Sequence, residues 1–204
     1  MTRLLGLTPP DNVFSPAMTD DLSRRAGQPT HEALWPTDLF TQGIGWVITA
    51  RFKLEGARVQ AGIFLIDAFC LGAKLAVYED CDGDDYRRRI RDHYLSSFPM
   101  VATEPWCARK LVEQAVQYAQ DLGFVPHPDY KKAARVFGGV RAEQCSQRFT
   151  FGHEGKPLYV RGPRETEGQA QRIVWYLQQR CGSGNYEYSV MLGEAGDIDR
   201  SFEE

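Results

Sequence analysis

A carboxylate, a thiol and an amine lie close together in the first half of the chain. An apolar run ends at Asp67, and Asp67, Cys70 and Lys74 fall within eight positions. A thiolate becomes a nucleophile when a nearby cation or histidine lowers its pKa, so Cys70 could attack a substrate while Asp67 orients its base. Lys74 is also a candidate binding residue. A structural role is the favoured interpretation, because cysteine is often buried and aspartate often binds backbone amides at a strand end.

His127 is the best candidate for a general base. It lies between Pro126 and Pro128, which restrict the backbone and could hold the imidazole at the rim of a cleft. A Pro-His-Pro turn is also an ordinary rigid connection, in which a surface histidine needs no role. The spacing does not say whether His127 meets Cys70, so a catalytic site of Cys70, His127 and Asp67 is a hypothesis about the fold.

Further basic side chains are candidates for binding. His153 and Lys156 lie in a glycine-flanked turn, where the backbone could approach a ligand. The densest positive cluster contains Arg87, Arg88 and Arg91. Aspartates surround this cluster and offset much of its field, so a solvated helix face is favoured over a site for nucleic acid or an acidic partner.

The sequence has no strong signal for a metal or a cofactor, and we predict neither. No Cys-x-x-Cys pair occurs, and no two histidines stand close together. The turn Gly182-Ser183-Gly184 follows a predicted helix instead of preceding one, so it lacks the context of a nucleotide-binding loop. Three strands before a long helix resemble the opening of ribonuclease-H-like nucleases, with Asp67, Glu79 and Glu113 as imaginable metal ligands. That family has its first carboxylate on the first strand, so this hypothesis ranks third.

The composition is that of an ordinary globular protein. The chain has 204 residues, 43% of them hydrophobic, and a formal net charge of −3. This charge gives no general attraction to nucleic acid, so another protein is the favoured partner. No apolar run approaches the roughly 20 residues that cross a bilayer, and no secretory leader is visible, so we predict a cytoplasmic protein without membrane contact. The five widely spaced cysteines are predicted to be reduced.

The apolar pattern predicts an α+β fold, with a largely antiparallel sheet and amphipathic helices packed against it. The predicted strands are rich in β-branched and aromatic residues, and they are 43–52, 57–67, 71–78, 148–151, 158–161 and 186–191. The predicted helices are 84–95, 105–122, 129–138 and 170–181. The first two strands are expected to form a hairpin, as are 148–151 and 158–161. Asp84 is expected to cap the first helix.

We expect one domain over residues 31–192. Residues 1–30 contain several prolines among polar residues and no sustained apolar period, so they predict a loosely structured strap. Residues 193–204 are acidic and weakly apolar, which is typical of a loose tail.

Three stretches resemble patterns in a group of uncharacterised bacterial proteins. They are Gly62–Lys74 (GIFLIDAFCLGAK), Leu122–Asp129 (LGFVPHPD) and Phe151–Tyr159 (FGHEGKPLY). Together they span most of the chain from about residue 31 to residue 191. Some members of the group carry a metal-binding tail motif that this sequence lacks. The resemblance implies one coherent domain and a bacterial origin, and it implies no reaction.

The leading functional hypothesis is a non-catalytic intracellular interaction or regulatory module of a bacterial system. It depends on the missing complete catalytic motif and on four tryptophans that could serve a core or an interface, Trp35, Trp46, Trp106 and Trp175. The alternative is a small hydrolase or transferase that uses Cys70, His127 and Asp67. Whether the protein is an enzyme is left open by the sequence.

Overall fold

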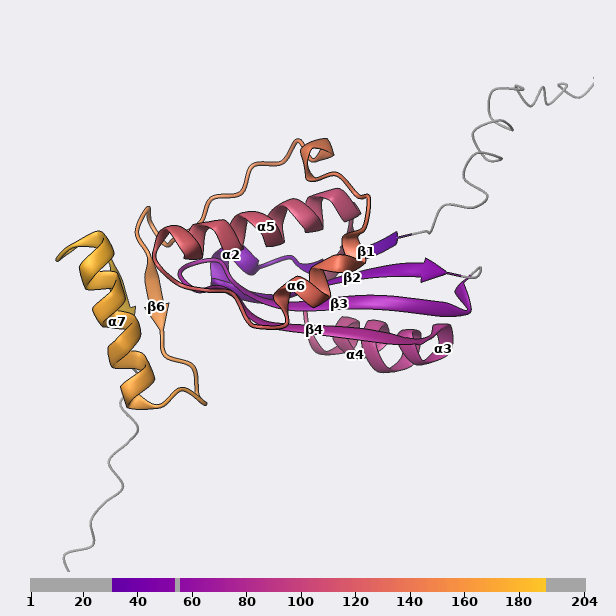
Figure 1. Ribbon diagram of the computed structural model, residues 1–204, viewed down its shortest axis with the longest axis horizontal. Helices are drawn as coiled ribbons and strands as arrows, with labels where there is room; N and C mark the ends of the chain where they lie inside the picture. The colour runs from indigo at the N-terminus through magenta and orange to yellow at the C-terminus, as the bar shows by residue number, and fades with distance from the viewer. Residues whose placement is uncertain (1–30, 54–55, 190–204) are drawn as a thin grey trace, which may run out of the picture. The chain divides into compact units, whose positions relative to one another are not determined.

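The structure is a computed structural model that describes residues 31–53 and 56–189 (Figure 1). The described residues belong to one compact unit that begins at His31. The predictions of a strap at 1–30 and an acidic tail at 193–204 fall outside this part of the chain. Within it, no helix is long and apolar enough to cross a membrane. The fold class is α+β, as predicted, with helices on a largely antiparallel sheet.

A five-stranded sheet forms the centre of the structure. Its strands are β1 (His31–Pro36), β2 (Ile44–Lys53), β3 (Arg58–Asp67), β4 (Gly72–Asp82) and β5 (Met100–Thr103). Their order across the sheet is β4-β3-β2-β1-β5, and every neighbouring pair is antiparallel. The predicted hairpin β2–β3 and the third strand β4 are confirmed. The sequence pattern does not indicate β1 and β5.

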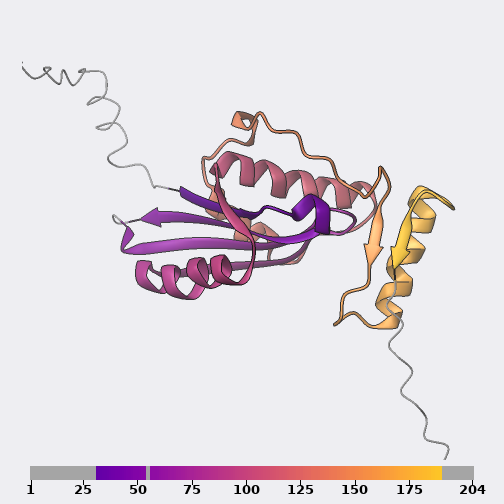
Figure 2. The same cartoon turned by 180° about the vertical axis from the view of Figure 1, so that it is seen from behind.

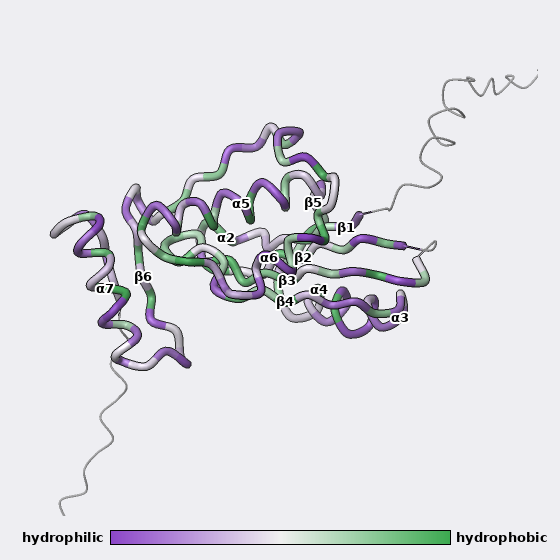
Figure 3. Tube along the Cα trace, viewed as in Figure 1, coloured by the Kyte–Doolittle hydropathy of each residue, from purple (hydrophilic) through white to green (hydrophobic). Residues whose placement is uncertain are grey.

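Successive side chains of the central strands face opposite sides of the sheet, as the pleat requires. Val47 and Phe64 belong to one apolar cluster, whereas their neighbours Ile48 and Ile63 belong to another. Figure 3 shows apolar residues gathered in the strands, whereas the helices alternate between apolar and polar segments. Both faces of the sheet are therefore apolar, and both need a cover.

Helices cover both faces (Figure 1). One face packs against α5 (Pro105–Asp121), α6 (Tyr130–Ala133) and the 3-10 turn Ala134–Phe137. The helix α5 has the predicted apolar stripe, which includes the buried Ala108, Leu111, Val112, Ala115 and Ala119, and Pro105 opens it. The short helix α2 (Leu39–Gln42) connects β1 to β2, and a second 3-10 turn covers Ala142–Gln144.

The other face packs against a composite helix formed by α3 (Gly83–Asp85), a π-helical turn (Tyr86–Arg91) and α4 (Asp92–Ser97). Asp82 is its cap, because its carboxylate accepts a hydrogen bond of 2.8 Å from the Asp85 amide. The prediction that Asp84 caps this helix is therefore wrong. The strand β4 continues to Asp82, so the helix begins directly at Gly83.

The last elements form a small β-α-β unit (Figure 2). Strands β6 (Leu158–Val160) and β7 (Glu187–Ser189) pair in parallel, and α7 (Glu167–Cys181) connects them. A reciprocal pair of hydrogen bonds between Thr166 and Gln169 caps α7. The predicted helix 170–181 is confirmed with an earlier start. The predicted strand 186–191 is confirmed as far as Ser189, and the rest falls outside the described residues.

The predicted hairpin of 148–151 with 158–161 is wrong. The two arms do not form a ladder with each other, and only His153 and Lys156 form an isolated bridge. The arms instead reach the turn between β3 and β4, because the Gly152 amide donates to the Ala68 carbonyl and the Leu158 amide to the Phe69 carbonyl. These long-range acceptors replace the local partners that a hairpin would supply.

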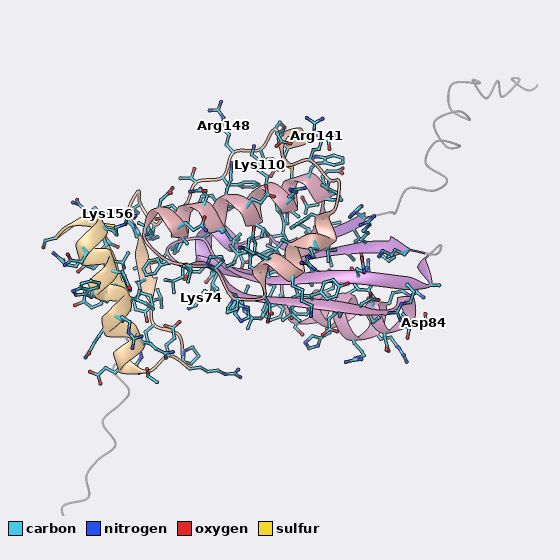
Figure 4. The ribbon with its side chains drawn as sticks, in the orientation of Figure 1. Lys74, Asp84, Lys110, Arg141, Arg148 and Lys156 are labelled. Carbon is cyan, nitrogen blue, oxygen red and sulfur yellow. A yellow bond between two sulfur atoms is a disulfide. The ribbon has the colours of Figure 1, made fainter. Side chains whose placement is uncertain are left out.

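The prediction that all cysteines are reduced is also wrong, because Cys107 and Cys145 form a disulfide. Cys107 lies in the first turn of α5, and the loop after residue 138 folds back over this helix. Lys110 holds the loop by donating to the carbonyls of Cys145 (2.8 Å) and Gln147 (2.6 Å). Figure 4 shows Lys110 on the side of α5 that faces this loop. Cys70, Cys81 and Cys181 are free thiols.

Candidate functional site

Three stretches far apart in the sequence meet at the turn between β3 and β4. The Gly152 amide donates to the Ala68 carbonyl at 2.9 Å, and the His127 amide donates to the Ala73 carbonyl at 3.0 Å. Residues 62–74 are thus joined by backbone hydrogen bonds to residues 122–129 and to residues 151–159. The turn is the natural place to look for the predicted site residues.

Asp67 fixes this turn. Its carboxylate accepts hydrogen bonds from the amides of Phe69 (3.1 Å) and Cys70 (2.8 Å). Asp67 is only 6% exposed. Burial raises the pKa of Asp67 to about 6, although the nearby Lys74 and the amide donors lower it. The arrangement is that of an aspartate that caps its own turn.

Cys70 lies in an apolar cluster with Tyr159, Ala170 and Leu177 and is fully buried. Burial raises the pKa of its thiol far above the ordinary value, and the charge of Asp67 raises it further. Both effects disfavour the thiolate that a nucleophile needs. The surroundings of Cys70 therefore suit packing between the sheet and α7.

His127 lies near the turn, where its amide donates to the Ala73 carbonyl, and its side chain pairs with Asp129. Its Nδ1 accepts a hydrogen bond of 3.2 Å from the Asp129 amide and lies 4.0 Å from Asp129 Oδ2. Within the described residues, no hydrogen bond or ion pair joins His127 to Cys70 or Asp67. The structure thus brings Asp67 and Cys70 together and leaves His127 outside the pair.

Lys74 belongs to a half-buried cluster centred on Glu165. Its Nζ lies 2.7 Å from Glu165 Oε1, while Glu165 Oε2 accepts hydrogen bonds from the Tyr159 hydroxyl (2.6 Å) and the Gly162 amide (3.0 Å). Burial raises the pKa of Glu165, but the hydrogen bonds from Lys74 and Tyr159 outweigh it and hold the pKa below the usual value. This cluster joins β4 to the β-α-β unit.

The sequence interpretation missed Glu165 and the role of Tyr159. Glu165 lies in a short polar stretch between β6 and α7, and no motif surrounds it. Its partner Lys74 is far away in the sequence, so only the fold reveals the pair.

His153 and Lys156 contact the β-α-β unit. The ring of His153 lies 5.2 Å from the ring of Phe69, and its Nδ1 lies 3.8 Å from Glu187 Oε2. This Nδ1 is buried and has no hydrogen-bond partner. Lys156 Nζ donates to the Gly184 carbonyl at 2.9 Å. The glycine-flanked turn thus reaches neighbouring segments of the same chain.

The predicted arginine cluster is paired with carboxylates. Arg87 forms an ion pair with Asp84, Arg88 one of 3.2 Å with Asp85, and Arg91 one of 2.9 Å with Glu32. Figure 4 shows Asp84 and Lys74 at opposite ends of the sheet, so these arginines lie far from the β3–β4 turn. These ion pairs neutralise most of the positive charge that would attract an acidic partner.

The carboxylates considered for metal binding are not gathered. Glu113 pairs with Arg109 at 2.7 Å on α5, whereas Asp67 binds backbone amides. Residues 31–53 and 56–189 contain no group of three or more histidine, cysteine, aspartate or glutamate side chains that could hold a metal ion.

A pocket of about 410 Å³ lies between α7 and β7, and we call it the α7–β7 groove. Its walls are mainly apolar and include Ala170, Val174, Trp175, Tyr186 and Tyr188. Trp175 and Tyr188 are each 56% exposed, which is unusual for side chains so large. Trp175 is a residue that the sequence singled out for a core or an interface, and the structure places it at a surface.

Among the residues that the structure describes, one edge of β7 has no paired strand, and Tyr188 of this strand lines the groove. The other edge pairs with β6, where the Glu187 amide donates to the Pro157 carbonyl and the Arg161 amide to the Ser189 carbonyl. The intervening Tyr188 directs its amide and carbonyl away from β6, and within the described residues no strand pairs with that edge. The groove therefore combines an aromatic wall with a free strand edge.

Comparisons with protein-family models, with curated proteins and with solved structures find no match to this chain.

Proposed function

We propose that this chain is a non-catalytic interaction module, and that its α7–β7 groove binds an extended segment of a partner protein as an added strand. The observation that carries this proposal is the edge of β7 that pairs with no strand of residues 31–53 and 56–189, beside the exposed Trp175 and Tyr188. A strand with one unpaired edge offers amide and carbonyl groups to another chain. Strand addition is a recurrent mode of peptide recognition, in which backbone hydrogen bonds give affinity and side-chain pockets give specificity.

The charges of the groove favour an uncharged, apolar occupant. Arg161 and Glu167 are the charged residues that line it within the described part of the chain, and they are of opposite sign. Their fields largely cancel, so neither an acidic nor a basic segment gains from binding here. The aromatic wall, in contrast, gains about 25 cal/mol for each Å² of apolar surface that an occupant removes from water.

The alternative of a thiol hydrolase or transferase has weaker support. Cys70 is buried with a raised pKa, and within the described residues no hydrogen bond or ion pair joins His127 to Cys70 or Asp67. No specific observation favours metal-dependent nuclease chemistry. A bacterial origin, a regulatory role and a cytoplasmic location are part of the same proposal. The disulfide is a point against the last of these, because such bonds are commoner in oxidising compartments.

A display library of random linear peptides tests the proposal directly. We expect the protein to select peptides that are uncharged and alternate apolar side chains, because alternate residues of an added strand face the groove. Replacing Trp175 or Tyr188 with alanine should raise the dissociation constants of the selected peptides at least about tenfold, as truncation of a central aromatic contact does. Fluorescence anisotropy of labelled peptides gives the dissociation constants.

Val160→Ala is the matched control. Val160 is 48% exposed on the neighbouring strand, but it pairs with Ser189 and so faces away from the side that carries Tyr188. This variant should bind the selected peptides like the wild type. A library that yields no peptide above background, or peptides that bind the Trp175 and Tyr188 variants unchanged, would contradict the proposal.

A further inference from the structure

A cavity of about 260 Å³ lies between the sheet and the composite helix, and we call it the β4–α4 cavity. The strands β3 and β4 line one side of it, and the composite helix lines the other. Ile63 and Ile90 are buried and belong to one apolar cluster, and Val77 and Tyr94 extend this part of the lining. The inner part of the cavity is therefore apolar.

The lining of the cavity also contains charged side chains, and its described carboxylates outnumber its guanidinium groups. Glu79 and Asp85 are the carboxylates, and Arg89 is the guanidinium. Glu79 is exposed, and its side chain forms no hydrogen bond or ion pair with a residue that the structure describes. Asp85 pairs with the exposed Arg88 at 3.2 Å and Arg89 at 3.7 Å. Ion pairs with exposed side chains are weak, so both carboxylates can bind a further cation.

The thiol of Cys81 also lines the cavity, and it reports the electrostatic field there. Burial raises the pKa of this thiol. The charges of Glu79, Asp82 and Asp85 raise it further, and the weaker effect of Arg58 opposes them. Surroundings that disfavour an anion at this position favour a cation.

A π-helical turn directs the helical part of the lining toward one side. Asp85 precedes the turn Tyr86–Arg91, Arg89 and Ile90 belong to it, and Tyr94 follows it. Hydrogen bonds in a π-helix connect residue i to residue i+5, so residues about four or five positions apart share a face. Such turns are rare, and they occur frequently at functional sites.

We propose that the β4–α4 cavity binds a small organic cation, with its ammonium group on Glu79 and Asp85 and its apolar part over Ile90. An ammonium group that donates to carboxylates forms charge-assisted hydrogen bonds, which are stronger than neutral ones. The volume is just below the usual range of about 300–1,000 Å³ for ligand pockets, so a ligand with a single ring fits better than a nucleotide. Among the described residues, the cavity shares no lining residue with the α7–β7 groove.

Phenethylamine is the probe for this proposal, and phenylpropanoate, which has a carboxylate in place of the ammonium group, is its control. At about pH 8 the probe is charged, because an alkylamine has a pKa near that of lysine, about 10.4. The neutral thiol reagent dithiodipyridine modifies accessible cysteines, and peptide mass spectrometry measures the rate at each one. A saturating amount of phenethylamine should slow the modification of Cys81 several-fold. It should leave Cys181 unchanged, because this free thiol does not line the cavity.

Two substitutions in the lining should change the affinity in opposite directions, which a purely structural role would not do. Glu79→Gln should raise the dissociation constant of phenethylamine about tenfold, because it removes a charge-assisted hydrogen bond. Arg89→Gln should lower it, because it removes a like charge from the cavity. Asp92→Asn is the matched control, at an exposed carboxylate of α4 outside the cavity, and it should bind like the wild type. Titrations followed in ¹H–¹⁵N spectra give the dissociation constants.

No slowing at Cys81 by phenethylamine, equal slowing by phenylpropanoate, or an unchanged dissociation constant in Glu79→Gln would overturn the proposal. The methylamide of acetyl-lysine tests whether the cation belongs to a protein instead. It should protect Cys81 less than phenethylamine does, because its linear stem covers less of the apolar lining. Stronger protection by this lysine mimic would overturn the assignment to a small molecule.

Discussion

Asp67 illustrates how one residue type serves two purposes that a sequence cannot separate. A carboxylate after an apolar strand is a candidate acid or base and also a candidate turn cap. Its two amide partners and its exposure of 6% identify the cap. Burial also removes water from the charged carboxylate, which raises the pKa of Asp67 to about 6.

This raised pKa predicts a pH-dependent stability. Between the unfolded value of 3.8 and about 6, the folded state binds more protons at Asp67 than the unfolded state does. The contribution of Asp67 to the free energy of unfolding is therefore largest at low pH and falls as the pH rises to about 6, by at most about 1.4 kcal/mol per pH unit. Asp67→Asn keeps a side-chain oxygen that accepts hydrogen bonds from the backbone amides but does not titrate. The stability of this variant should therefore not show this decrease with pH.

Urea unfolding of both proteins between pH 4 and pH 7 measures the effect. Other carboxylates titrate in the same range, but they cancel in the difference between Asp67→Asn and the wild type. This difference should shift in favour of the variant as the pH rises, with Lys74 as the charged neighbour that opposes the shift. A difference that stays constant from pH 4 to pH 7 would show that burial does not govern Asp67.

The residue scale also sets the limit of the sequence interpretation. The structural alternatives for Asp67 and Cys70 could be argued from residue type alone, because both types have strong local or burial preferences. The pairing of Lys74 with Glu165, or of Cys107 with Cys145, could not. These contacts join segments that are distant in sequence, and only the tertiary fold decides which of them meet.

At the scale of elements, the apolar periodicity of the sequence predicts those helices and strands whose type depends on their own residues. The hairpin β2–β3 and the helix α5 each carry a long, regular apolar pattern, so the sequence predicts their secondary structure. Strands β1 and β5 are short, and their pairing with each other connects residues 33–36 to 100–103. The hairpin predicted for 148–161 is wrong for the same reason. Its amides bind carbonyls of the β3–β4 turn, which is distant in sequence, instead of local partners.

The disulfide predicts a measurable difference between the oxidised and the reduced protein. Cys107 and Cys145 are 38 residues apart, and closing a loop of this size stabilises a fold by roughly 2–4 kcal/mol. Reduction should therefore lower the melting temperature by about 5–15 °C. Differential scanning calorimetry with and without a reductant measures this, and the double variant Cys107→Ser, Cys145→Ser should be insensitive to the reductant. An unchanged melting temperature of the wild type would show that the bond contributes little.

At the scale of the whole described unit, two parts are joined by few polar contacts. The β-α-β unit meets the sheet through the apolar cluster around Cys70, through Glu165 and through the hydrogen bond from the Leu158 amide to the Phe69 carbonyl. Glu165→Gln would leave Lys74 half-buried without its carboxylate, a loss of about 1–3 kcal/mol. We expect this loss to appear mainly as faster local opening of β6 and β7.

Hydrogen–deuterium exchange can localise this effect. Amides of β6 and β7 should exchange faster in Glu165→Gln, whereas amides of β2 and β3 should keep their protection. Glu143→Gln is the control, because Glu143 lies 3.9 Å from Arg141 in an exposed pair of little expected worth. Equal acceleration in all strands would mean that Glu165 stabilises the fold as a whole and not the attachment of this unit.

The position of β1 between β2 and β5 has a consequence for synthesis of the chain. β2 follows β1 almost at once, but β5 comes only after the meander β2–β4 and the composite helix have been made. The ribosome adds about 5–20 residues per second, so the outer edge of β1 waits roughly 3–13 seconds for its partner. During this interval a strand edge is available to other nascent chains. Its duration depends on the topology and the rate of translation, and no gain in native stability can shorten it.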